Sequence, residues 1–594
     1  MEAFVYNSLP TETSFRYLVL NPGLGDVPLS GSLRTDDING AIDFDALSYV
    51  WGAPHQVSGI ACDGRVVRLT ASLRDALRRA RLPDRPRHVW ADQICINQVD
   101  LAERSQQVTL MARIYAKSNT TLVYLGRASE EEARNVASLV DEVNAIVNAH
   151  MGDSDSWDNV PQAKSTDPIA SDGRWNAVAQ LTRRPWFDRV WVVQEAGLSV
   201  KPQILYGDLT ISWGSLFRAL KWVQMRATAI AYNLHLDWHG IHMDRQEIWS
   251  CQKPPGTATT WSFLDILHAS RQLQATEARD HLFAFLGHPA ASHHATGQLI
   301  VVPDYTRDVT ELHVELARKY IEWTQNLDIL SFVQETGRLL PSWVPSWVAF
   351  DGSVLAQLGE AVFSAGGGPN VRAAPLFVDD GKKLRVRGVM VGEIQFLTEA
   401  FADTDFSWAR TGPPGDEGDK WAGILAHVLD PTTPYLHVEQ SRLVSCAVTL
   451  TAGLSQLVEK QLEIGIAAFV SPYLTHIRPR IGNNQLLHLS SLALESRDNT
   501  DNPLTEAAIA APLINRRFVV TKNGRYGLAP VSARSGDEIW VLFGAKTPFV
   551  LRRAASSAKE YSLIGECFAL GVMDGETARE YREGQLTEEA LTII

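Results

Sequence analysis

The chain has 594 residues, of which 45% are hydrophobic and 21% are charged, and this balance is typical of a globular protein and excludes a largely disordered one. Its length suits about three or four domains. The net charge of −13, from 55 basic and 68 acidic residues, argues against nucleic-acid binding that rests on overall positive charge.

The cysteines and the hydropathy pattern indicate a cytoplasmic protein. The five cysteines are far apart and form no CxxC pair, which argues against a disulfide framework and against a cysteine-based zinc site. The first residues lack the basic and apolar regions of a signal peptide, and no run of about 18 apolar residues occurs. We therefore expect a soluble protein without a membrane span. His235, His239 and His242 are near metal-ligand spacing, but without a cysteine pair or an HExxH motif we expect no metal site.

The first third of the chain predicts an α/β domain. Residues 46–50 form a buried strand that ends at Trp51 and Gly52, and residues 88–92 form a second short strand. Between the two, an apolar stripe at helical spacing predicts a helix whose solvated face carries a crowd of arginines. The stripe consists of Leu73, Ala76, Leu77 and Ala80, and the arginines are Arg65, Arg68, Arg74, Arg78, Arg79, Arg81, Arg85 and Arg87.

A strand–helix–strand unit follows. Asp100 is an N-cap for a helix over residues 101–117, and Glu103 stands where a capping box places an acid. The inward stripe of this helix is Leu101, Val108, Met111 and Tyr115. Residues 120–125 form the next strand, so the strands on either side of the helix should be parallel.

The rest of the chain changes character twice. A helix is predicted from about Pro185 to Gly197, and residues 203–206 form a strand. The middle is mainly helical, with its clearest helix over residues 311–323, and the tail carries separated strands at residues 383–388, 517–521, 538–543 and 561–566. We expect three parts: an α/β domain over residues 1–215, a mainly helical region over 216–365, and a β-rich domain with a helical insertion over 366–594.

Several blocks of the first third resemble the motifs of the fungal heterokaryon incompatibility (HET) domain, in the order that the family has them. The blocks are residues 47–52 (LSYVWG), 90–98 (WADQICINQ), 103–108 (ERSQQV) with Met111, Ile114, Tyr115, Leu125 and Gly126, and 184–195 (RPWFDRVWVVQE). Position 91 is Ala where the family pattern usually has Asp, and Asp92 follows it. Weaker resemblance continues at residues 275–280, 285–287, 303–305 and 573–576.

The resemblance implies a role in fungal non-self recognition and regulated cell death. It also implies a remote likeness to the Toll/interleukin-1 receptor (TIR) fold, with a mostly parallel sheet. Some TIR domains hydrolyse NAD with one glutamate that lies four residues after a tryptophan, and Trp191 and Glu195 have this spacing. The resemblance therefore implies NAD as a substrate, no bound cofactor, and self-assembly or an incompatibility partner protein.

The motif blocks also converge without reference to the family. Ligands of open α/β sheets bind beyond the carboxyl ends of strands, where Trp51, Asp92 and Gly126 fall. Residues four apart on a helix share a face, so Trp191 would raise the pKa of Glu195 by excluding water. A single carboxylate can stabilise an oxocarbenium-like centre, so Glu195 is the catalytic candidate. The substrate-binding candidates are Tyr49, Trp51, Gly52, Asp92, Asn97, Gln98, Arg184, Arg189 and Trp191.

Each candidate also has a structural interpretation. The tryptophans can be core residues, Asp92 and Asn97 can be turn or cap residues, and Glu195 with Arg189 can be a structural ion pair. Three functions therefore remain open. One is an enzyme that hydrolyses NAD, and another is a non-catalytic signalling module that acts through protein contacts in the same pathway. The third is a regulator with a degenerate site and another cellular role, against which the intact Tyr49, Trp51, Asp92 and Glu195 argue.

Overall fold

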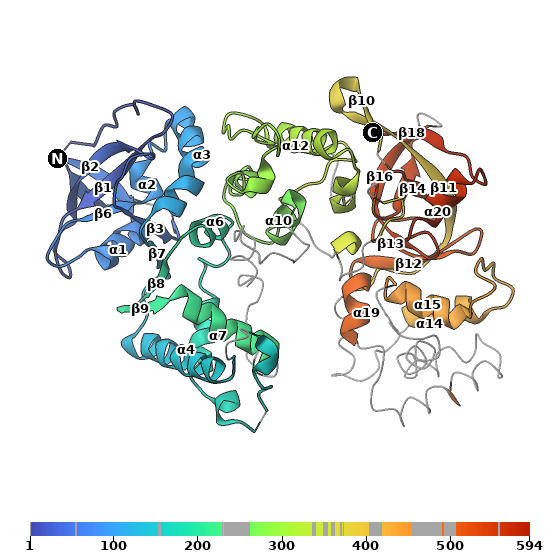
Figure 1. Cartoon of the computed structure of the whole chain (residues 1–594), viewed down its shortest axis with the longest axis horizontal. Coiled ribbons are helices and arrows are strands. Elements are labelled where there is room, and N and C mark those ends of the chain that lie inside the picture. The colour runs from blue at the N-terminus through green and yellow to red at the C-terminus, as the bar shows by residue number, and fades with distance from the viewer. Residues whose placement is uncertain are drawn as a thin grey trace. The chain divides into compact units, whose positions relative to one another are not determined.

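The computed structural model describes residues 2–53, 56–151, 156–164, 166–227, 230, 262–334, 340–348, 354–357, 363–368, 371, 373–402, 405, 419–453, 490–491, 506–555 and 559–594. These residues form two compact units, Met1–Val309 and Thr310–Ile594, each built around its own sheet (Figure 1). No helix in the described part of the chain has the length and apolar character needed to span a bilayer.

The first unit is built on a mixed nine-stranded sheet with the order β5-β4-β2-β1-β6-β3-β7-β8-β9. Its four central strands β6, β3, β7 and β8 are parallel, whereas β1–β2, β1–β6, β4–β5 and β8–β9 are antiparallel. The bounds are β1 (Ser14–Leu20), β2 (Ser30–Asp37), β3 (Asp45–Tyr49), β4 (Gln56–Cys62), β5 (Arg65–Thr70), β6 (Arg87–Trp90), β7 (Thr121–Tyr124), β8 (Pro202–Tyr206) and β9 (Leu209–Ser212).

The sheet is therefore mixed, and the expectation of a mostly parallel sheet is not confirmed: outside the four central strands only β2 and β4 are parallel among the described pairs. Two of the antiparallel pairs follow from short connections. Asp63 and Gly64 join β4 to β5, and Gly207 and Asp208 join β8 to β9. A two-residue connection can link only antiparallel strands, and Asp63, Gly64 and Gly207 have the positive φ angles that such tight turns need.

The predicted elements before residue 125 are present. The helix α1 (Ala71–Ala80) buries Leu73, Ala76, Leu77 and Ala80. The helix α3 (Leu101–Lys117) begins as predicted at Asp100, whose carboxylate accepts from the backbone N–H groups of Ala102 and Glu103. Leu101 is exposed because it lies in the first turn, where the helix has not yet reached the sheet. The short helix α2 (Asp92–Cys95) follows β6 directly.

The helix predicted from Pro185 to Gly197 is wrong for its first half. Residues 185–190 form successive turns, and only α6 (Val192–Gly197) is helical. The backbone of this stretch pairs with a distant residue, since the Asp188 carbonyl accepts from the Gln274 N–H and the Val190 N–H donates to the Gln274 carbonyl. Backbone groups engaged in this way cannot take part in a helical hydrogen-bond ladder.

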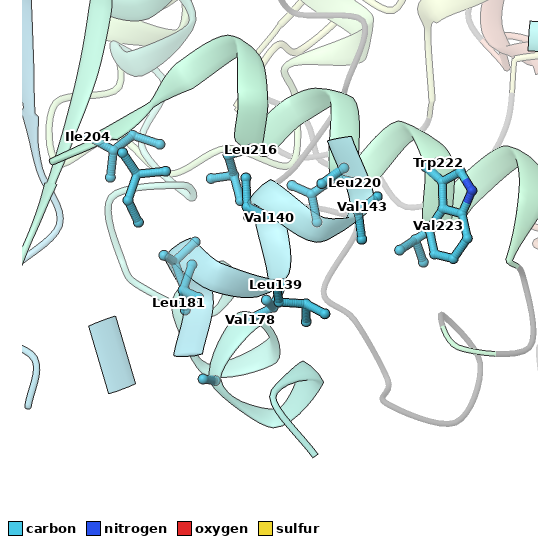
Figure 2. Packing of buried hydrophobic residues seen from close by; sticks show 14 of the residues in the cluster. Leu139, Val140, Val143, Val178, Leu181, Ile204, Leu216, Leu220, Trp222 and Val223 are labelled. Carbon is cyan, nitrogen blue, oxygen red and sulfur yellow. The ribbon is translucent and has the colours of Figure 1, made fainter. Parts of the chain in front are cut away.

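A helical layer packs against the β8 end of the sheet. It consists of α4 (Glu130–Met151), α5 (Trp175–Thr182) and α7 (Trp213–Arg226). Figure 2 shows Leu139, Val140 and Val143 of α4 among apolar side chains of the other two helices and of β8. The other α-helices of this unit among the described residues are α10 (Phe263–Ala269) and α11 (Asp280–Phe283).

The second unit is rich in strands, as predicted. The pairings β14-β15-β16-β18-β11 and β11–β14 close a ring of five strands, and β12, β13 and β17 extend from β11. The strands are β10 (Leu376–Val378), β11 (Lys383–Leu397), β12 (Arg516–Thr521), β13 (Tyr526–Pro530), β14 (Glu538–Leu542), β15 (Phe549–Arg553), β16 (Glu560–Glu566), β17 (Phe568–Ala569) and β18 (Glu589–Ile593). The α-helices within the described ranges of this unit are α12 (Val309–Thr324), α14 (Asp419–Leu429), α15 (Arg442–Leu450), α19 (Glu506–Leu513) and α20 (Glu576–Arg582).

Helices lie between the strands of this unit, where the sequence predicted a helical insertion. The helices α14 and α15 come between β11 and β12 in the chain and contribute Trp421, Ile424 and Val444 to an apolar cluster with Phe518 of β12. The helix predicted over residues 311–323 is α12. The domain boundaries at residues 215 and 365 stay predictions.

Candidate functional site

The carboxyl ends of β6, β3 and β7 lie along one edge of the first unit's sheet, because these neighbouring strands are parallel. Tyr49 is the last residue of β3, and Asp92 opens α2 two residues after β6 ends. The sequence blocks that carry Tyr49, Trp51 and Asp92 therefore meet in space, as the position of their strands predicted.

Asp92 is the centre of a hydrogen-bonded group at this edge. Its Oδ1 accepts from the Tyr49 hydroxyl at 2.9 Å and from its neighbour's backbone N–H at 2.8 Å, and its Oδ2 accepts from Trp51 Nε1 at 2.7 Å. The Asp92 carbonyl accepts from Gln98 Nε2 at 2.9 Å, which fixes the turn around α2. Burial raises the pKa of Asp92, although Arg189 and the bonds from Trp51 and Tyr49 act to lower it.

Glu195 lies on α6 and is almost completely buried, with 2% of its surface exposed. Its Oε2 accepts from the Ser48 hydroxyl, and that hydroxyl accepts from Trp186 Nε1 at 2.7 Å. Both carboxylate oxygens also contact Arg189, from Nη1 to Oε2 and from Nη2 to Oε1 at 3.4 Å each. Burial raises the pKa of Glu195, and the positive charge of Arg189 opposes that shift.

Arg189 connects the two carboxyl groups. Its Nη1 donates to the Tyr49 carbonyl at 2.7 Å while the guanidinium holds Glu195, and 18% of its side chain is exposed. Burial by itself would lower the pKa of Arg189, but the charges of Glu195 and Asp92 raise it. The result is a cation between two acids whose pKa values are raised, and perturbed groups of this kind are frequent at functional sites.

Trp191 has different partners from Glu195. It is the N-cap residue of α6, and its Nε1 donates to Asp280 Oδ2 at 3.0 Å. The Tyr305 hydroxyl donates to the other oxygen of this buried carboxylate at 2.7 Å, and the Arg104 guanidinium lies 3.7 Å from the centre of the Tyr305 ring. The segment that follows the motif blocks therefore anchors the beginning of the helix that carries Glu195.

Arg184, Asn97 and Gly52 also lie apart from this hydrogen-bonded group. Arg184 Nη2 is 3.2 Å from Glu132 Oε1 and 3.2 Å from the Tyr206 hydroxyl, on the β8 side of the sheet. The backbone N–H of Asn97 donates to Glu103 at 2.7 Å. Gly52 has a φ of +70° in the exposed loop after β3, so this position favours glycine.

The sequence did not identify Ser48, Trp186 or Asp280 as site residues. One signal was available for Ser48: a hydroxyl within the continuous apolar strand β3 must find a hydrogen-bond partner when it is buried. Asp280 belongs to the weakly matching segment 275–280, but its contact with Trp191 joins residues 89 positions apart, which a pattern of local spacing does not encode.

The described residues contain no group of three or more His, Cys, Asp or Glu side chains that could hold a metal ion. His235, His239 and His242 lie outside the described residues. The chemistry at this edge is that of two carboxyl groups, one guanidinium and the Trp51 indole, which is 37% exposed beside Asp92. These groups can protonate a leaving group, stabilise a cation and stack on an aromatic ring.

Two family models match parts of this chain. The family model described as "Heterokaryon incompatibility protein (HET)" matches residues 44–195, and the one described as "Het-6 beta-barrel domain" matches residues 495–586. The protein "Heterokaryon incompatibility protein 6, OR allele" of Neurospora crassa is 26% identical over 684 aligned positions, which cover 97% of this chain and 96% of the relative. No solved structure matches. The HET match begins just before β3 and ends on Glu195, so it spans the whole hydrogen-bonded group around Asp92 and Arg189, and this part of the chain matches the heterokaryon incompatibility (HET) domain.

Proposed function

We propose that this protein acts in fungal heterokaryon incompatibility, that is, in non-self recognition followed by regulated cell death. The observation that carries the proposal is the similarity to the Neurospora incompatibility protein over nearly the full length of both chains. In this proposal the HET domain over residues 1–215 produces the response in the cytoplasm, and it is triggered by an incompatibility partner protein or by self-assembly.

We propose further that the HET domain hydrolyses NAD, in the manner of a TIR-like enzyme. Water would add to the ribose carbon as its bond to nicotinamide breaks, giving ADP-ribose, nicotinamide and a proton. Glu195 would stabilise the positive charge that develops on the ribose. Asp92 and Gln98 would bind ribose hydroxyls, Arg189 would bind the pyrophosphate, and Tyr49 and Trp51 would flank the rings. Arg184 and Trp191 have other partners in this structure, so they would join the pyrophosphate and ring contacts only after the domain rearranges.

The contacts of Glu195 define what such catalysis requires. Its carboxylate is buried and bound to Arg189, so a substrate can reach it only after the guanidinium moves. The side chain of Arg189 is 18% exposed, so its guanidinium could bind a phosphate once it leaves Glu195. We therefore place the active state in an assembled form of the domain.

The same contacts favour a second function, that of a non-catalytic signalling module. Both oxygens of Glu195 already have partners in Ser48 and Arg189, and a satisfied, buried ion pair is an ordinary structural element. In this second proposal the group around Glu195 holds α6 and β3 together, and signalling proceeds through contacts between proteins.

The test is incubation of the purified full chain with NAD over a range of protein concentrations, with separation of nicotinamide and ADP-ribose. Catalysis predicts turnover that rises with assembly and is lost in Glu195→Gln, which keeps the side-chain volume. Glu130→Gln, a change at an exposed position of α4, is the matched control and should retain full turnover. Absence of turnover at every concentration, or full turnover in folded Glu195→Gln, would exclude the enzyme.

Expression in a fungal host separates the two functions in the cell. Growth arrest by the parent chain that is abolished by Glu195→Gln, in a variant with unchanged thermal unfolding, favours NAD hydrolysis. Growth arrest that persists in Glu195→Gln favours the signalling module. Failure of the parent chain to affect growth alongside any incompatible partner strain would contradict the incompatibility role itself.

A further inference from the structure

A second feature of the first unit lies beyond the group around Glu195. A cleft of about 550 Å³ opens at the carboxyl ends of β7 and β8, a size within the range of small-molecule sites. Its floor includes Gly126 and Gly207, which follow these two strands and are joined by a hydrogen bond of 3.3 Å from the Gly207 N–H to the Gly126 carbonyl. The cleft shares no lining residue with the Asp92–Glu195 group.

The two glycines suit the tight backbone at this point. Their φ angles are +99° at Gly126 and +54° at Gly207, a region that residues with a side chain rarely adopt. A Cβ added to Gly207 would lie 3.0 Å from the Ala128 carbonyl oxygen. The cleft therefore lies on a closely packed backbone, at the place where parallel strands of α/β proteins present their ligand sites.

Among the arginines of the cleft, Arg79 has the guanidinium that is held by the most hydrogen bonds. It lies on α1, and the β8–β9 turn holds it: Nε donates to the Gly207 carbonyl at 2.8 Å, and Nη2 donates to the Asp208 carbonyl at 3.1 Å and to Thr210 Oγ1 at 3.0 Å. These acceptors are neutral, and Nη1 of Arg79 takes part in none of the three hydrogen bonds. The sequence placed Arg79 on a solvated helix face, but its side chain is half-buried, and burial lowers its pKa.

Two further arginines line the walls. Arg78 pairs at 3.0 Å with Asp26, whose carboxylate is almost fully exposed, so water screens this pair strongly. Arg127 pairs with Asp75 at 2.9 Å, and it is itself largely exposed at the rim. Several guanidinium groups around one cleft can each donate two parallel hydrogen bonds to phosphate oxygens.

The lining also contains aspartates, and their negative charges limit which kinds of ligand the cleft can bind. The three arginines are accompanied by Asp26, Asp75 and Asp208, so the cleft does not offer the uniform positive charge of a nucleic-acid groove. Arginines bind phosphate oxygens, whereas carboxylates accept hydrogen bonds from hydroxyl groups. A molecule that carries both phosphate and vicinal hydroxyls matches this mixture.

We propose that the cleft at the ends of β7 and β8 binds a phosphorylated sugar, with Arg79 and Arg127 on the phosphate and the aspartates on the sugar hydroxyls. The volume of the cleft admits ligands up to the size of a nucleotide. This binding does not rest on turnover at Glu195, since occupancy of the cleft is measured directly.

Titration calorimetry of the full chain tests the proposal with ribose 5-phosphate, ADP, inorganic phosphate and ribose. We expect ribose 5-phosphate and ADP to bind, and inorganic phosphate to bind about tenfold more weakly because it cannot engage the aspartates. Ribose without a phosphate should give no binding heat. Added salt should weaken binding, because the ligand charge is partly screened in an open cleft.

Three variants assign the binding to named side chains. Arg127→Ala, at an exposed position, should weaken ribose 5-phosphate binding about tenfold, and Arg79→Lys should do so because an ammonium lacks the guanidinium fork. Asp208→Ala should weaken ribose 5-phosphate but not inorganic phosphate. Arg85→Ala is the matched control, since Arg85 is exposed, belongs to the same arginine-rich stretch and lies outside the cleft lining.

Three experimental results would contradict the proposal that the cleft binds a phosphorylated sugar. The proposal is overturned if neither ribose 5-phosphate nor ADP binds at about 1 mM, a weak-affinity limit. It is also overturned if Arg85→Ala weakens binding as much as Arg127→Ala, which would indicate general charge attraction. Tighter binding of a single-stranded oligonucleotide than of both small ligands would replace it with a nucleic-acid surface. Thermal unfolding of each variant shows that the fold is retained.

Discussion

Arg189 holds Glu195 through both of its terminal nitrogens, each 3.4 Å from a carboxylate oxygen, while one of them also donates to the Tyr49 carbonyl at the end of β3. This relationship ties the turn before α6 to the central strand of the sheet. It also supplies the positive charge that opposes the effect of burial on both Asp92 and Glu195.

Removal of that charge should destabilise the fold at neutral pH. Arg189→Ala leaves two buried carboxyl groups without their cation, and loss of one partner of a buried pair costs about 3–5 kcal/mol. The loss should shrink in acid, because the raised pKa values of both carboxyl groups favour their neutral forms there, and a neutral carboxyl group needs no cation. Urea unfolding at pH 7 and at pH 4 measures both values. Arg134→Ala, in the exposed pair with Glu130, should cost under about 1 kcal/mol, and an equal loss at both pH values in Arg189→Ala would contradict the argument.

The pH dependence of the parent chain follows from the raised pKa of Glu195. An acid whose folded pKa lies above its unfolded value contributes stability below the unfolded pKa, and that contribution is lost as the pH rises through the folded pKa. Glu195→Gln cannot ionise and lacks this dependence. The unfolding free energy of the parent chain minus that of Glu195→Gln should therefore fall as the pH rises from about 4 towards neutrality. A difference that stays flat or rises across this range would show that the folded pKa is not raised.

The Ser48 hydroxyl joins Trp186 to Glu195, and its removal tests that link. In Ser48→Ala the buried Trp186 Nε1 loses its acceptor and one Glu195 oxygen loses a donor, which should cost about 1–3 kcal/mol. Ser171→Ala, at an exposed turn, should change the unfolding free energy by less than about 0.5 kcal/mol. Ser48→Thr restores the hydroxyl but adds a methyl group, so it should recover only part of the loss. Urea unfolding of the three variants decides, and a neutral Ser48→Ala would mean that the link does not contribute.

The sequence predicts those features of the fold that are set by residues close together in the chain. The helix α3 begins and ends where predicted because Asp100 caps it and its apolar stripe is continuous. Tyr49 and Asp92 meet as predicted because strands that are parallel end at one edge. These features need only neighbouring residues and the general rules of parallel sheets.

The features that could not be predicted depend on contacts between distant residues. Residues 185–190 have the composition of a helix start, but pairing with Gln274 holds their backbone in turns. Arg81 belongs to the arginine-rich stretch expected to face water, yet it is buried because its guanidinium donates to the carbonyls of Val27 at 2.9 Å and Gly25 at 3.1 Å. A local pattern reports neither partner, so the direction of these side chains follows only from the folded chain.

The motif block over residues 103–108 begins with Glu103, whose partners in the structure indicate a structural role. Its carboxylate forms a bidentate ion pair with the Arg16 guanidinium, at 2.5 Å and 3.0 Å, and the side chains of Glu103 and Arg16 are both buried. The carboxylate also accepts a hydrogen bond from the Asn97 N–H. Glu103→Ala should therefore cost about 3–5 kcal/mol in urea unfolding. Glu130→Ala is the control at an exposed helical pair and should cost under about 1 kcal/mol. A loss in Glu103→Ala no larger than in this control would show that the pair does not stabilise the domain.

Gly287 tests the contact between α3 and the segment that follows the HET match. A Cβ added at this position would lie 2.2 Å from the Ala112 Cβ on α3 and 3.2 Å from the side-chain amide of Gln194 on α6. Gly287→Ala should therefore cost about 1–3 kcal/mol by overpacking. Ala112→Gly alone should cost about 1 kcal/mol, because glycine weakens a helix interior.

The double variant Gly287→Ala with Ala112→Gly should lose less unfolding free energy than the two single variants lose together, because the methyl group added at residue 287 fills the space of the one removed from residue 112. A double-mutant cycle in urea measures this coupling, and strict additivity would show that the two surfaces do not pack as described. Because Gln194 directly precedes Glu195, Gly287→Ala should also reduce any NAD turnover, and the double variant should restore part of it. Restored stability without restored turnover would mean that the overpacking acts on α3 and not on α6.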